Sequence, residues 1–354
     1  MSLFKRVLIF LFICILLVQV VFPLSVPDSI VFDYRLKYNV FKNNPDNIEA
    51  VLKKIKWQIK KQNLKEYVII LGDSVGFSSP CNPEESIGYH LNNLAENSGY
   101  KVKFFNLSIP SEYPGDTYTI IKMLDKYGIS TENLIINFNY FEFTADESGT
   151  GIFWFKDQLN DVDKDAYSHI YSKFNWKKPL FSQTKGKIKR FLNTNISLLL
   201  YKDYIRKYFS SVTSTNYKDL IGDPRPWYEK KDLHKKIKTS DYSWYFSDKP
   251  FVMDESRAQI YFINKIIEHQ EGKNTLVFLA AYNRELLKEE TSKYGYNNNL
   301  EKLKEYFKSK DVIYVDYDKK IDYNLYADFV HLIPEGYKVL SDDLWEKVRN
   351  DFFK

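Results

Sequence analysis

Three residues that lie far apart in this chain have the side-chain types of a nucleophilic acyl-transfer site. Ser74 follows an apolar run in "VIILGDSVGFSS", and Asp328 and His331 stand three positions apart in "YADFVHLIPEGYKVL". Acyl transfer needs a hydroxyl that attacks a carbonyl, an imidazole that takes its proton, and a carboxylate that orients the imidazole. Serine and aspartate are also common helix caps, so the Gly-Asp-Ser tripeptide alone is ambiguous. The role of Ser74 depends on whether the fold brings the two motifs together.

The surrounding sequence alternates apolar strands with amphipathic helices. The expected strands are "YVIIL", "KVKFFNLS", "NLIINFNYFEF", "TLVFLAAY" and "VIYVDY". The expected helices cover residues 83–97, 116–127, 254–270, 300–308 and 334–354. This alternation predicts an α/β fold, a doubly wound, flavodoxin-like five-stranded parallel sheet with helices on both faces. Ligands of such sheets bind beyond the carboxyl ends of the strands, so Ser74, after the first strand, and His331, after the last, should meet at one edge.

The N-terminus has the features of a membrane anchor. An apolar stretch from Val7 to Leu24 follows Lys5 and Arg6, and at about 1.5 Å per residue it is just long enough to cross a bilayer. The sequence "VFPLSVPDS" offers no good Ala-x-Ala-like cleavage site, which favours an uncleaved signal anchor over residues 1–25. The basic residues should stay in the cytoplasm, which places the rest of the chain outside a plasma membrane that is crossed once.

A long insertion interrupts the main domain. We expect a linker and a helix over residues 26–66, the domain over 67–354, and an insertion over 146–253, after the third strand. Between residues 151 and 250 there are 20 Lys and Arg against 11 Asp and Glu, a net charge of +9, and four of the six tryptophans. Such an insertion can form a cap or a docking surface. Basic residues interleaved with aromatic ones also suit nucleic acid, but the membrane anchor argues against such a partner.

Cysteine and histidine patterns indicate no second chemistry. Cys14 lies in the apolar segment and Cys81 stands alone, which excludes a disulfide framework. Cys81 has no basic neighbour that would activate its thiol. The five histidines lack the spacing of metal ligands, and no glycine-rich phosphate motif occurs. We therefore expect no metal and no cofactor.

The two motifs together resemble those of the SGNH (GDSL-type) hydrolases, a family of esterases, lipases and enzymes of carbohydrate O-acyl modification. "ILGDS" after a first strand matches the family's first motif, and "DFVHLIPEGY" before a final helix matches its last. The resemblance covers residues 67–143 and 254–354. It implies that Ser74 is the nucleophile, His331 the base and Asp328 the residue that orients the base.

The resemblance also implies an oxyanion hole, which stabilises the charge that develops on the substrate oxygen. Its donors would be the Ser74 N–H, the side-chain amide of Asn139 in "IINFNYFEF" and one further backbone N–H. The family's glycine at that last position corresponds to Ser111 in "NLSIPSEYPGDT", or to Gly115 if a short insertion is allowed. The family's Gly-x-Asn-Asp reads Asn-Phe-Asn-Tyr here, so both middle motifs depart from the family pattern.

With its membrane tether the chain is similar to SGNH-like proteins of cell-envelope polysaccharide acylation, which work beside a multi-pass acyl-donor protein. The resemblance implies an extracytoplasmic serine esterase or O-acyltransferase that acts on acyl esters, acetyl esters foremost, of envelope glycans. The alternative is a catalytically weak or inactive binding or assembly subunit of such a complex. The degenerate middle motifs favour this alternative, whereas the intact Ser74, Asp328 and His331 oppose it.

Overall fold

The centre of the domain is a sheet of five parallel strands. The computed structural model describes residues 3–144, 149–173, 180–212, 221–239 and 244–353. The strands are β1 (Glu66–Leu71), β2 (Val102–Asn106), β3 (Asn133–Asn139), β4 (Asn274–Ala280) and β5 (Ile313–Asp316). Their order is β2-β1-β3-β4-β5, and every neighbouring pair is parallel. This flavodoxin-like order confirms the predicted fold class.

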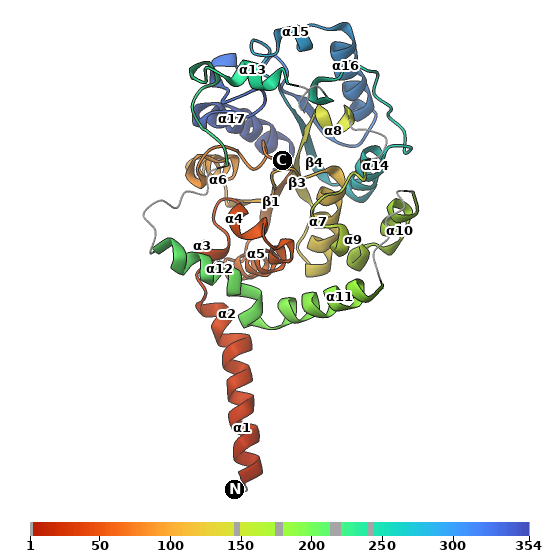
Figure 1. Cartoon of the computed structure of the whole chain (residues 1–354). Coiled ribbons are helices and arrows are strands. Elements are labelled where there is room, and N and C mark those ends of the chain that lie inside the picture. Colours follow the sequence, from red (N-terminus) through yellow and green to blue (C-terminus); the bar gives the residue numbers. More distant parts are fainter. Residues whose placement is uncertain (1–2, 145–148, 174–179, 213–220, 240–243, 354) are drawn as a thin grey trace.

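Helices cover both faces of the sheet, which is why its strands are continuously apolar. In the inner strand β1, Ile69 is fully buried and pairs with Phe105 of β2 and Leu134 of β3. One face carries α6 (Ile87–Asn97) and α17 (Pro334–Asp351), which pack against each other (Figure 1). The other face carries α7 (Pro114–Tyr127) and α14 (Ala258–Gln270). At the edge of the sheet, α16 (Tyr294–Lys308) packs against β5.

Capping residues determine where the first of these helices begins. Asn82 and Glu85 form the predicted capping box, but it closes only the 3-10 turn η3 (Pro83–Glu85). Ser86 then caps α6, with its hydroxyl accepting the N–H of Tyr89 at 3.3 Å. The single helix predicted for residues 83–97 is therefore a turn followed by a helix.

The N-terminal residues form a long apolar helix that projects from the body (Figure 1). It consists of α1 (Leu3–Leu16), the π-helical turn η1 (Leu17–Val21) and α2 (Phe22–Ser25). The helix has 23 residues, and its most apolar stretch is not buried against the body. It is long and apolar enough to cross a membrane, as the sequence predicted.

Residues 26–66, which we predicted to be a linker and a helix, are part of the domain core. They form α3 (Asp28–Val31), α4 (Tyr38–Phe41), the 3-10 turn η2 (Pro45–Asn47) and α5 (Ile48–Lys61). Val31, Phe41 and Ile55 have no exposed surface. Hydrophobic periodicity detects only the longest of these elements, because helices of four residues are too short to show a repeat.

Arg35 joins this segment to the turn that follows Ser74. Its guanidinium is buried and donates to the carbonyl oxygens of Phe77 at 2.8 Å, Ser78 at 3.1 Å and Cys81 at 2.7 Å. Hydrogen bonds from a charged donor are stronger than those between neutral groups. The N-terminal segment therefore holds the backbone just beyond the predicted nucleophile.

We expect Arg35→Met to lower the free energy of unfolding by about 3 kcal/mol, because three buried carbonyls lose a charged donor. Thermal denaturation of the two proteins measures the change. The matched control is Arg225→Met, because Arg225 is largely exposed and pairs with an exposed Asp223, and this variant should leave Tm unchanged. Equal Tm values for both variants and the parent would mean that the Arg35 bonds contribute no stability.

The insertion between α8 (Phe141–Thr144) and α14 has two parts that lie in different places. The first part leads through α9 (Lys156–Val162) and α10 (Lys164–Lys173) to α11 (Leu180–Asn195) and α12 (Ser197–Val212), on the side from which α1 projects (Figure 1). The second part contains the turn η4 (Trp227–Glu229) and α13 (Leu233–Ile237), at the other end of the body. The backbone N–H of Trp227 donates to the Tyr326 carbonyl at 3.0 Å, next to the loop of Asp328.

The remaining short elements are α15 (Lys288–Thr291) and η6 (Tyr323–Leu325).

Candidate active site

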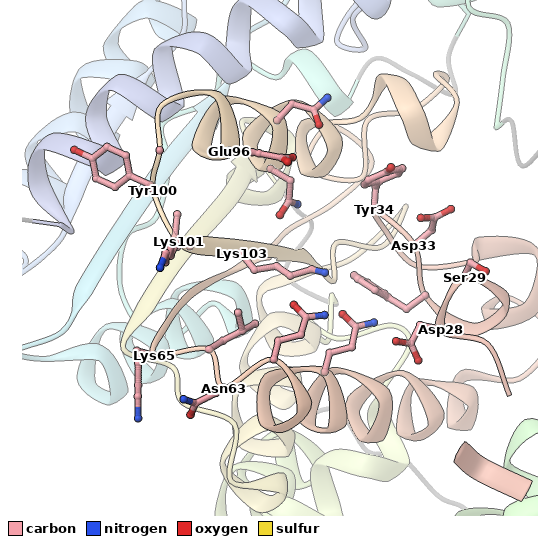
Figure 2. Close-up of a pocket in the computed structure, with 18 residues that line it drawn as sticks. Asp28, Ser29, Asp33, Tyr34, Asn63, Lys65, Glu96, Tyr100, Lys101 and Lys103 are labelled. Carbon is pink, nitrogen blue, oxygen red and sulfur yellow. The ribbon is translucent and has the colours of Figure 1, made fainter. Parts of the chain in front are cut away.

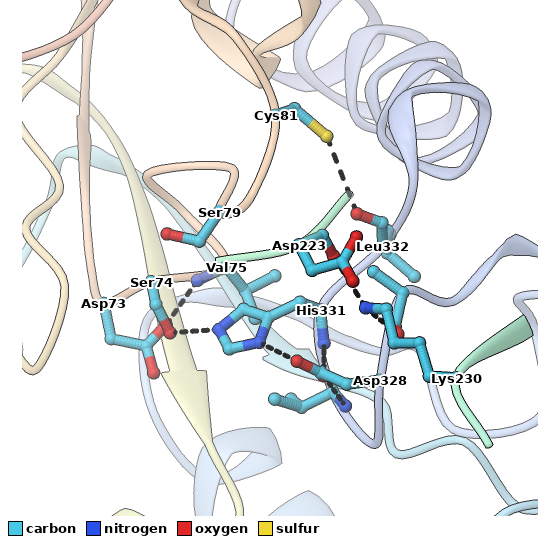
Figure 3. A network of polar contacts seen from close by, with 12 residues as sticks. Asp73, Ser74, Val75, Ser79, Cys81, Asp223, Lys230, Asp328, His331 and Leu332 are labelled. Carbon is cyan, nitrogen blue, oxygen red and sulfur yellow. Dashed lines mark hydrogen bonds and ion pairs between the residues drawn. The ribbon is translucent and has the colours of Figure 1, made fainter. Parts of the chain in front are cut away.

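The structure brings the three residues that the sequence singled out into direct contact (Figure 3). Ser74 Oγ lies 2.8 Å from His331 Nε2, and His331 Nδ1 lies 2.8 Å from Asp328 Oδ2. Both distances are those of good hydrogen bonds. Residues that lie 257 positions apart in the chain thus meet at the carboxyl edge of the sheet, as the predicted strand order requires. The arrangement is that of a nucleophile, a base and a residue that orients the base.

The turn after β1 presents Ser74 to the imidazole. Gly72 has a φ of +139°, and a Cβ there would lie 2.5 Å from Asn137 Cβ, so this position requires glycine. Asp73 turns the chain, with Oδ1 accepting the Val75 N–H at 2.9 Å. Residues 74–80 form successive turns and no helix. Ser74 therefore does not act as the helix cap that its tripeptide also allowed.

A tight loop holds His331 in place. Asp328 Oδ1 accepts the backbone N–H of Val330 at 2.9 Å and of His331 at 2.8 Å, while Oδ2 accepts from the ring. The Ala327 N–H donates to the His331 carbonyl at 2.8 Å, which closes the loop. Pro334 then starts α17, where a proline costs no hydrogen bond. The spacing Asp-x-x-His thus places both the carboxylate and the imidazole with one turn.

The charges around the imidazole stabilise its protonated form. Burial acts to lower the pKa of His331, but the Asp328 carboxylate, its hydrogen bond and Asp73 outweigh burial and raise that pKa above 6.5. Burial acts to raise the pKa of Asp328, yet the charge of His331 and the hydrogen bonds to Asp328 hold it below 3.8. An ionised carboxylate beside a strengthened base suits the removal of a proton from a serine hydroxyl.

The pH dependence of turnover should follow the titration of His331. Since the base must be neutral, kcat/KM should rise with pH, with a midpoint above 6.5 because the pKa of His331 is raised. Asp328→Asn removes the main cause of the raised pKa, so the midpoint should move to lower pH. Initial rates on an aryl acetate across the neutral range measure both midpoints. A midpoint that stays in place in the variant would assign the titration to another group.

Asn139, at the end of β3, is held against the turn of Ser74. Its side-chain amide donates to the carboxylate of Asp73, and its backbone N–H donates to Glu142 Oε1 at 2.9 Å. A primary amide has two N–H donors, so one remains for a substrate oxygen. Burial raises the pKa of Asp73 to about 6, against the opposing effects of the Val75 N–H, His331 and Asn139. The side chain of Asn139 is therefore held in one orientation beside the turn of Ser74.

The two alternatives for the second backbone donor differ in the structure. The Gly115 N–H donates to the Gly151 carbonyl at 2.7 Å, so it is not free to bind a substrate oxygen, contrary to that alternative. Ser111 has a φ of 63°, in the left-handed region that favours glycine, which fits the glycine of the family motif at this position. Its loop is held to the nucleophile turn by the Ile109 N–H, which donates to the Gly72 carbonyl at 2.8 Å. Ser111 is the better candidate.

We expect Asn139→Ala to lower kcat by about 10²-fold or more with little change in KM, because an oxyanion donor acts mainly in the transition state. The matched control is Asn133→Ala, at the opposite end of the same strand, which should keep the parental kcat. Steady-state kinetics on an aryl acetate compares the two variants. Parental kcat in Asn139→Ala would exclude this side chain from the oxyanion hole.

Lys230, in the second part of the insertion, borders the site and was missed by the sequence analysis. Its Nζ donates to the carbonyls of Ala327 at 2.7 Å and Asp223 at 2.6 Å (Figure 3). The charge of Lys230 acts against the raised pKa of His331. Lys230 ties the insertion to the residue that precedes Asp328. Its partners are backbone atoms, so no residue spacing in the sequence could have indicated it.

Three further buried carboxyl groups shape the loops around the site. Asp116 accepts the backbone N–H groups of the segment 153–155, and Glu112 accepts the Ile109 N–H at 3.0 Å. Glu142 accepts the Asn139 N–H. Burial raises the pKa of all three, to about 6 for Asp116 and well above 4.5 for the two glutamates. In the described ranges, no group of three or more His, Cys, Asp or Glu residues is placed to hold a metal ion.

A cavity of about 960 Å³ has none of Ser74, Asp328 and His331 in its lining (Figure 2). It is lined by residues that include Lys65 and Lys101, which precede β1 and β2, together with Glu96 of α6 and Asp28 of α3. These positions are at the amino ends of the strands. Ser74 follows the carboxyl end of β1, so this cavity is not the place where Ser74 would meet a substrate.

No family model matches the sequence, and no curated protein matches it. What the chain does must be inferred from the geometry of Ser74, His331 and Asp328.

Proposed function

We propose that this chain is a membrane-anchored serine O-acyltransferase or esterase of the SGNH type. We infer that it acts outside the plasma membrane on acyl esters, acetyl esters foremost, of cell-envelope glycans. The observation that carries the proposal is the contact of Ser74 Oγ with His331 Nε2 at 2.8 Å, with Asp328 on the other ring nitrogen. The contact lies beyond the carboxyl ends of the strands, where ligands of doubly wound sheets bind.

The proposed reaction has two halves that share the same residues. Ser74 Oγ attacks the ester carbonyl as His331 takes its proton. The backbone N–H groups of Ser74 and Ser111 and the side-chain amide of Asn139 bind the resulting oxyanion. Collapse of this intermediate breaks the bond to the alcohol, which leaves with the proton from His331. His331 then takes a proton from water or from a glycan hydroxyl, whose oxygen attacks the acyl-serine. Ser74 Oγ leaves with the proton from His331, which restores the free enzyme.

Two features support a glycan at a membrane as the acceptor or donor. The helix from Leu3 to Ser25 is apolar enough to span a bilayer, and Lys5 and Arg6 at its start favour a cytoplasmic N-terminus. Trp244 of the insertion is 40% exposed, and its ring lies 5.8 Å from that of Phe141, just beyond Asn139. A partly exposed aromatic side chain near the site suits the apolar face of a sugar ring. A multi-pass acyl-donor protein is a fitting partner, and nucleic acid is not.

The two outcomes of the acyl-enzyme can be separated with the full chain in detergent or nanodiscs. The protein is mixed with an activated acyl ester, and the Ser74 adduct is followed by mass spectrometry with and without envelope oligosaccharides. An adduct that persists in water and is discharged by an oligosaccharide identifies a transferase. Rapid discharge by water, unaffected by the oligosaccharide, identifies an esterase.

A second candidate function is a binding or assembly subunit without turnover. It is favoured by the Asn139 side chain, which has no exposed surface, and by the Gly115 N–H, which already bonds Gly151. Such a subunit would bind oligosaccharides but form no acyl-Ser74 adduct. The same mass-spectrometric experiment, combined with a direct binding measurement, distinguishes it from the enzyme.

A further inference from the structure

Helix α11 of the insertion turns polar side chains toward the body of the protein and apolar side chains outward. The side chains of Arg190 and Asn193 are buried, whereas Ile188, Phe191 and Leu192 are 57%, 66% and 42% exposed. The three apolar residues have the i, i+3, i+4 spacing of one helix face. A helix at the surface of a water-soluble domain usually buries its apolar face. The outward face of α11 therefore fits an apolar environment better than water.

A network of charges fixes this orientation. Arg190 forms ion pairs with Asp161 at 2.7 Å, Asp46 at 3.3 Å and Asp157 at 3.5 Å. Rotation of the helix to bury its apolar face would leave these three carboxylates without their shared cation, which is strongly unfavourable for partly buried charges. The exposed apolar face is thus a stable feature of the fold.

The end of α11 is attached to the apolar N-terminal helix. Gln19 of that helix accepts the N–H of Ser197 at 3.0 Å and its hydroxyl at 2.8 Å, and donates to the Asn195 carbonyl at 3.1 Å. Lys53 of α5 donates to the Thr194 carbonyl at 2.5 Å. In Figure 1, α11 extends from this junction along the side of the body from which α1 projects, across the direction of α1.

The position of Gln19 sets the depth of this junction. Gln19 precedes the end of the apolar helix at Ser25 by six residues, or about 9 Å at 1.5 Å per residue. Helices that lie in a membrane interface bury their apolar face about 5–10 Å into the boundary between headgroups and acyl chains. If α1 crosses a bilayer, Asn195 and Ser197, which bond Gln19, must lie at this depth. The adjoining C-terminal end of α11, with its outward apolar residues, must then lie there too.

We propose that α11 is an interfacial membrane helix that lies in the bilayer crossed by α1, with Ile188, Phe191 and Leu192 among the lipid chains. The exposed Lys187 and Lys189 would then lie near lipid phosphates. The inference rests on the proposed membrane anchor but not on the proposed enzyme activity. Its consequence is that the domain lies directly on the membrane in one orientation, instead of swinging on a single helix.

The test uses the full chain in nanodiscs and an environment-sensitive fluorophore on one cysteine. Cys14 is replaced by alanine, Cys81 has no exposed surface, and the label is placed at Phe191→Cys or, as a second position on the same face, at Ile188→Cys. The matched control is Tyr294→Cys, because Tyr294 is 85% exposed on α16. A fourth sample labels the native Cys14 and reports on the anchor alone. Quenching by lipids that carry a nitroxide near the headgroup, and for Cys14 by lipids that carry it deep in the acyl chain, is compared with quenching by aqueous iodide.

We expect the labels at positions 188 and 191 to be quenched severalfold more by nitroxide lipid than the label at 294, and severalfold less by iodide. Labels at 188 and 191 that behave like the label at 294, while Cys14 is quenched by lipid, would overturn the interfacial helix and leave the anchor in place. Labels shielded from iodide but not quenched by lipid would also overturn it, in favour of contact with a protein. No lipid quenching at Cys14 would refute the anchor and this inference together.

Discussion

Replacing Ser74 with alanine should lower kcat for an aryl acetate by roughly 10⁶-fold, because the reaction loses its nucleophile and retains only binding and the oxyanion donors. The hydroxyl of Ser74 bonds His331 and caps no helix, so the variant should fold and melt like the parent. Stopped or continuous assays of nitrophenol release, beside thermal denaturation, measure both properties.

The matched control for this variant is Ser79→Ala. Ser79 lies in the same turn, but its buried hydroxyl has no hydrogen-bond partner among the described residues, whereas the hydroxyl of Ser74 bonds His331 (Figure 3). This variant should keep the parental kcat. Loss of activity in both variants would point to a general disturbance of the turn, and full activity in Ser74→Ala would place the nucleophile elsewhere.

His331→Ala should be almost as damaging as Ser74→Ala, whereas Asp328→Asn should retain more activity. Without His331 no group takes the proton of Ser74 Oγ, and residues that act as one unit give similar losses when removed singly. The amide introduced by Asp328→Asn would keep the shape of the loop but would no longer fix the tautomer or stabilise the imidazolium, at a cost of about 10⁴-fold in kcat.

Steady-state kinetics of the single and double variants measures this ordering. The double variant Ser74→Ala/His331→Ala should be no slower than either single variant, because the two side chains act in one step. Losses that multiply in the double variant would mean that Ser74 and His331 act independently, against the geometry of their contact.

The strands and their order could be predicted because burial on both faces makes each parallel strand a continuous apolar run. The alternation with amphipathic helices then leaves few possible topologies. The edge of the sheet where Ser74 and His331 meet follows from that order. The short helices of residues 26–66 could not be predicted, since their place in the core depends on contacts such as those of Arg35 with carbonyls that lie far along the chain.

The candidate site could be predicted only where residue type and spacing carry the chemistry. Asp328 and His331 share one turn, so their spacing is visible in the sequence. Lys230 and the choice of Ser111 over Gly115 depend on backbone partners, which leave no pattern in the sequence. The basic, aromatic insertion was predicted from composition, but its division into a part beside the site and a part beside α1 depends on tertiary packing.

Covalent labelling with a fluorophosphonate tests most directly whether Ser74 is an activated nucleophile. Attack by Ser74 Oγ on phosphorus expels fluoride and leaves a stable phosphonyl-serine, whose position is read by peptide mass spectrometry. We predict one phosphonyl group, on Ser74, in the parent and in Ser79→Ala, and none in His331→Ala or Ser74→Ala under the same conditions. Equal labelling of the parent and His331→Ala, or a parent that stays unlabelled while still folded, would contradict the assignment of Ser74, His331 and Asp328 as a catalytic unit.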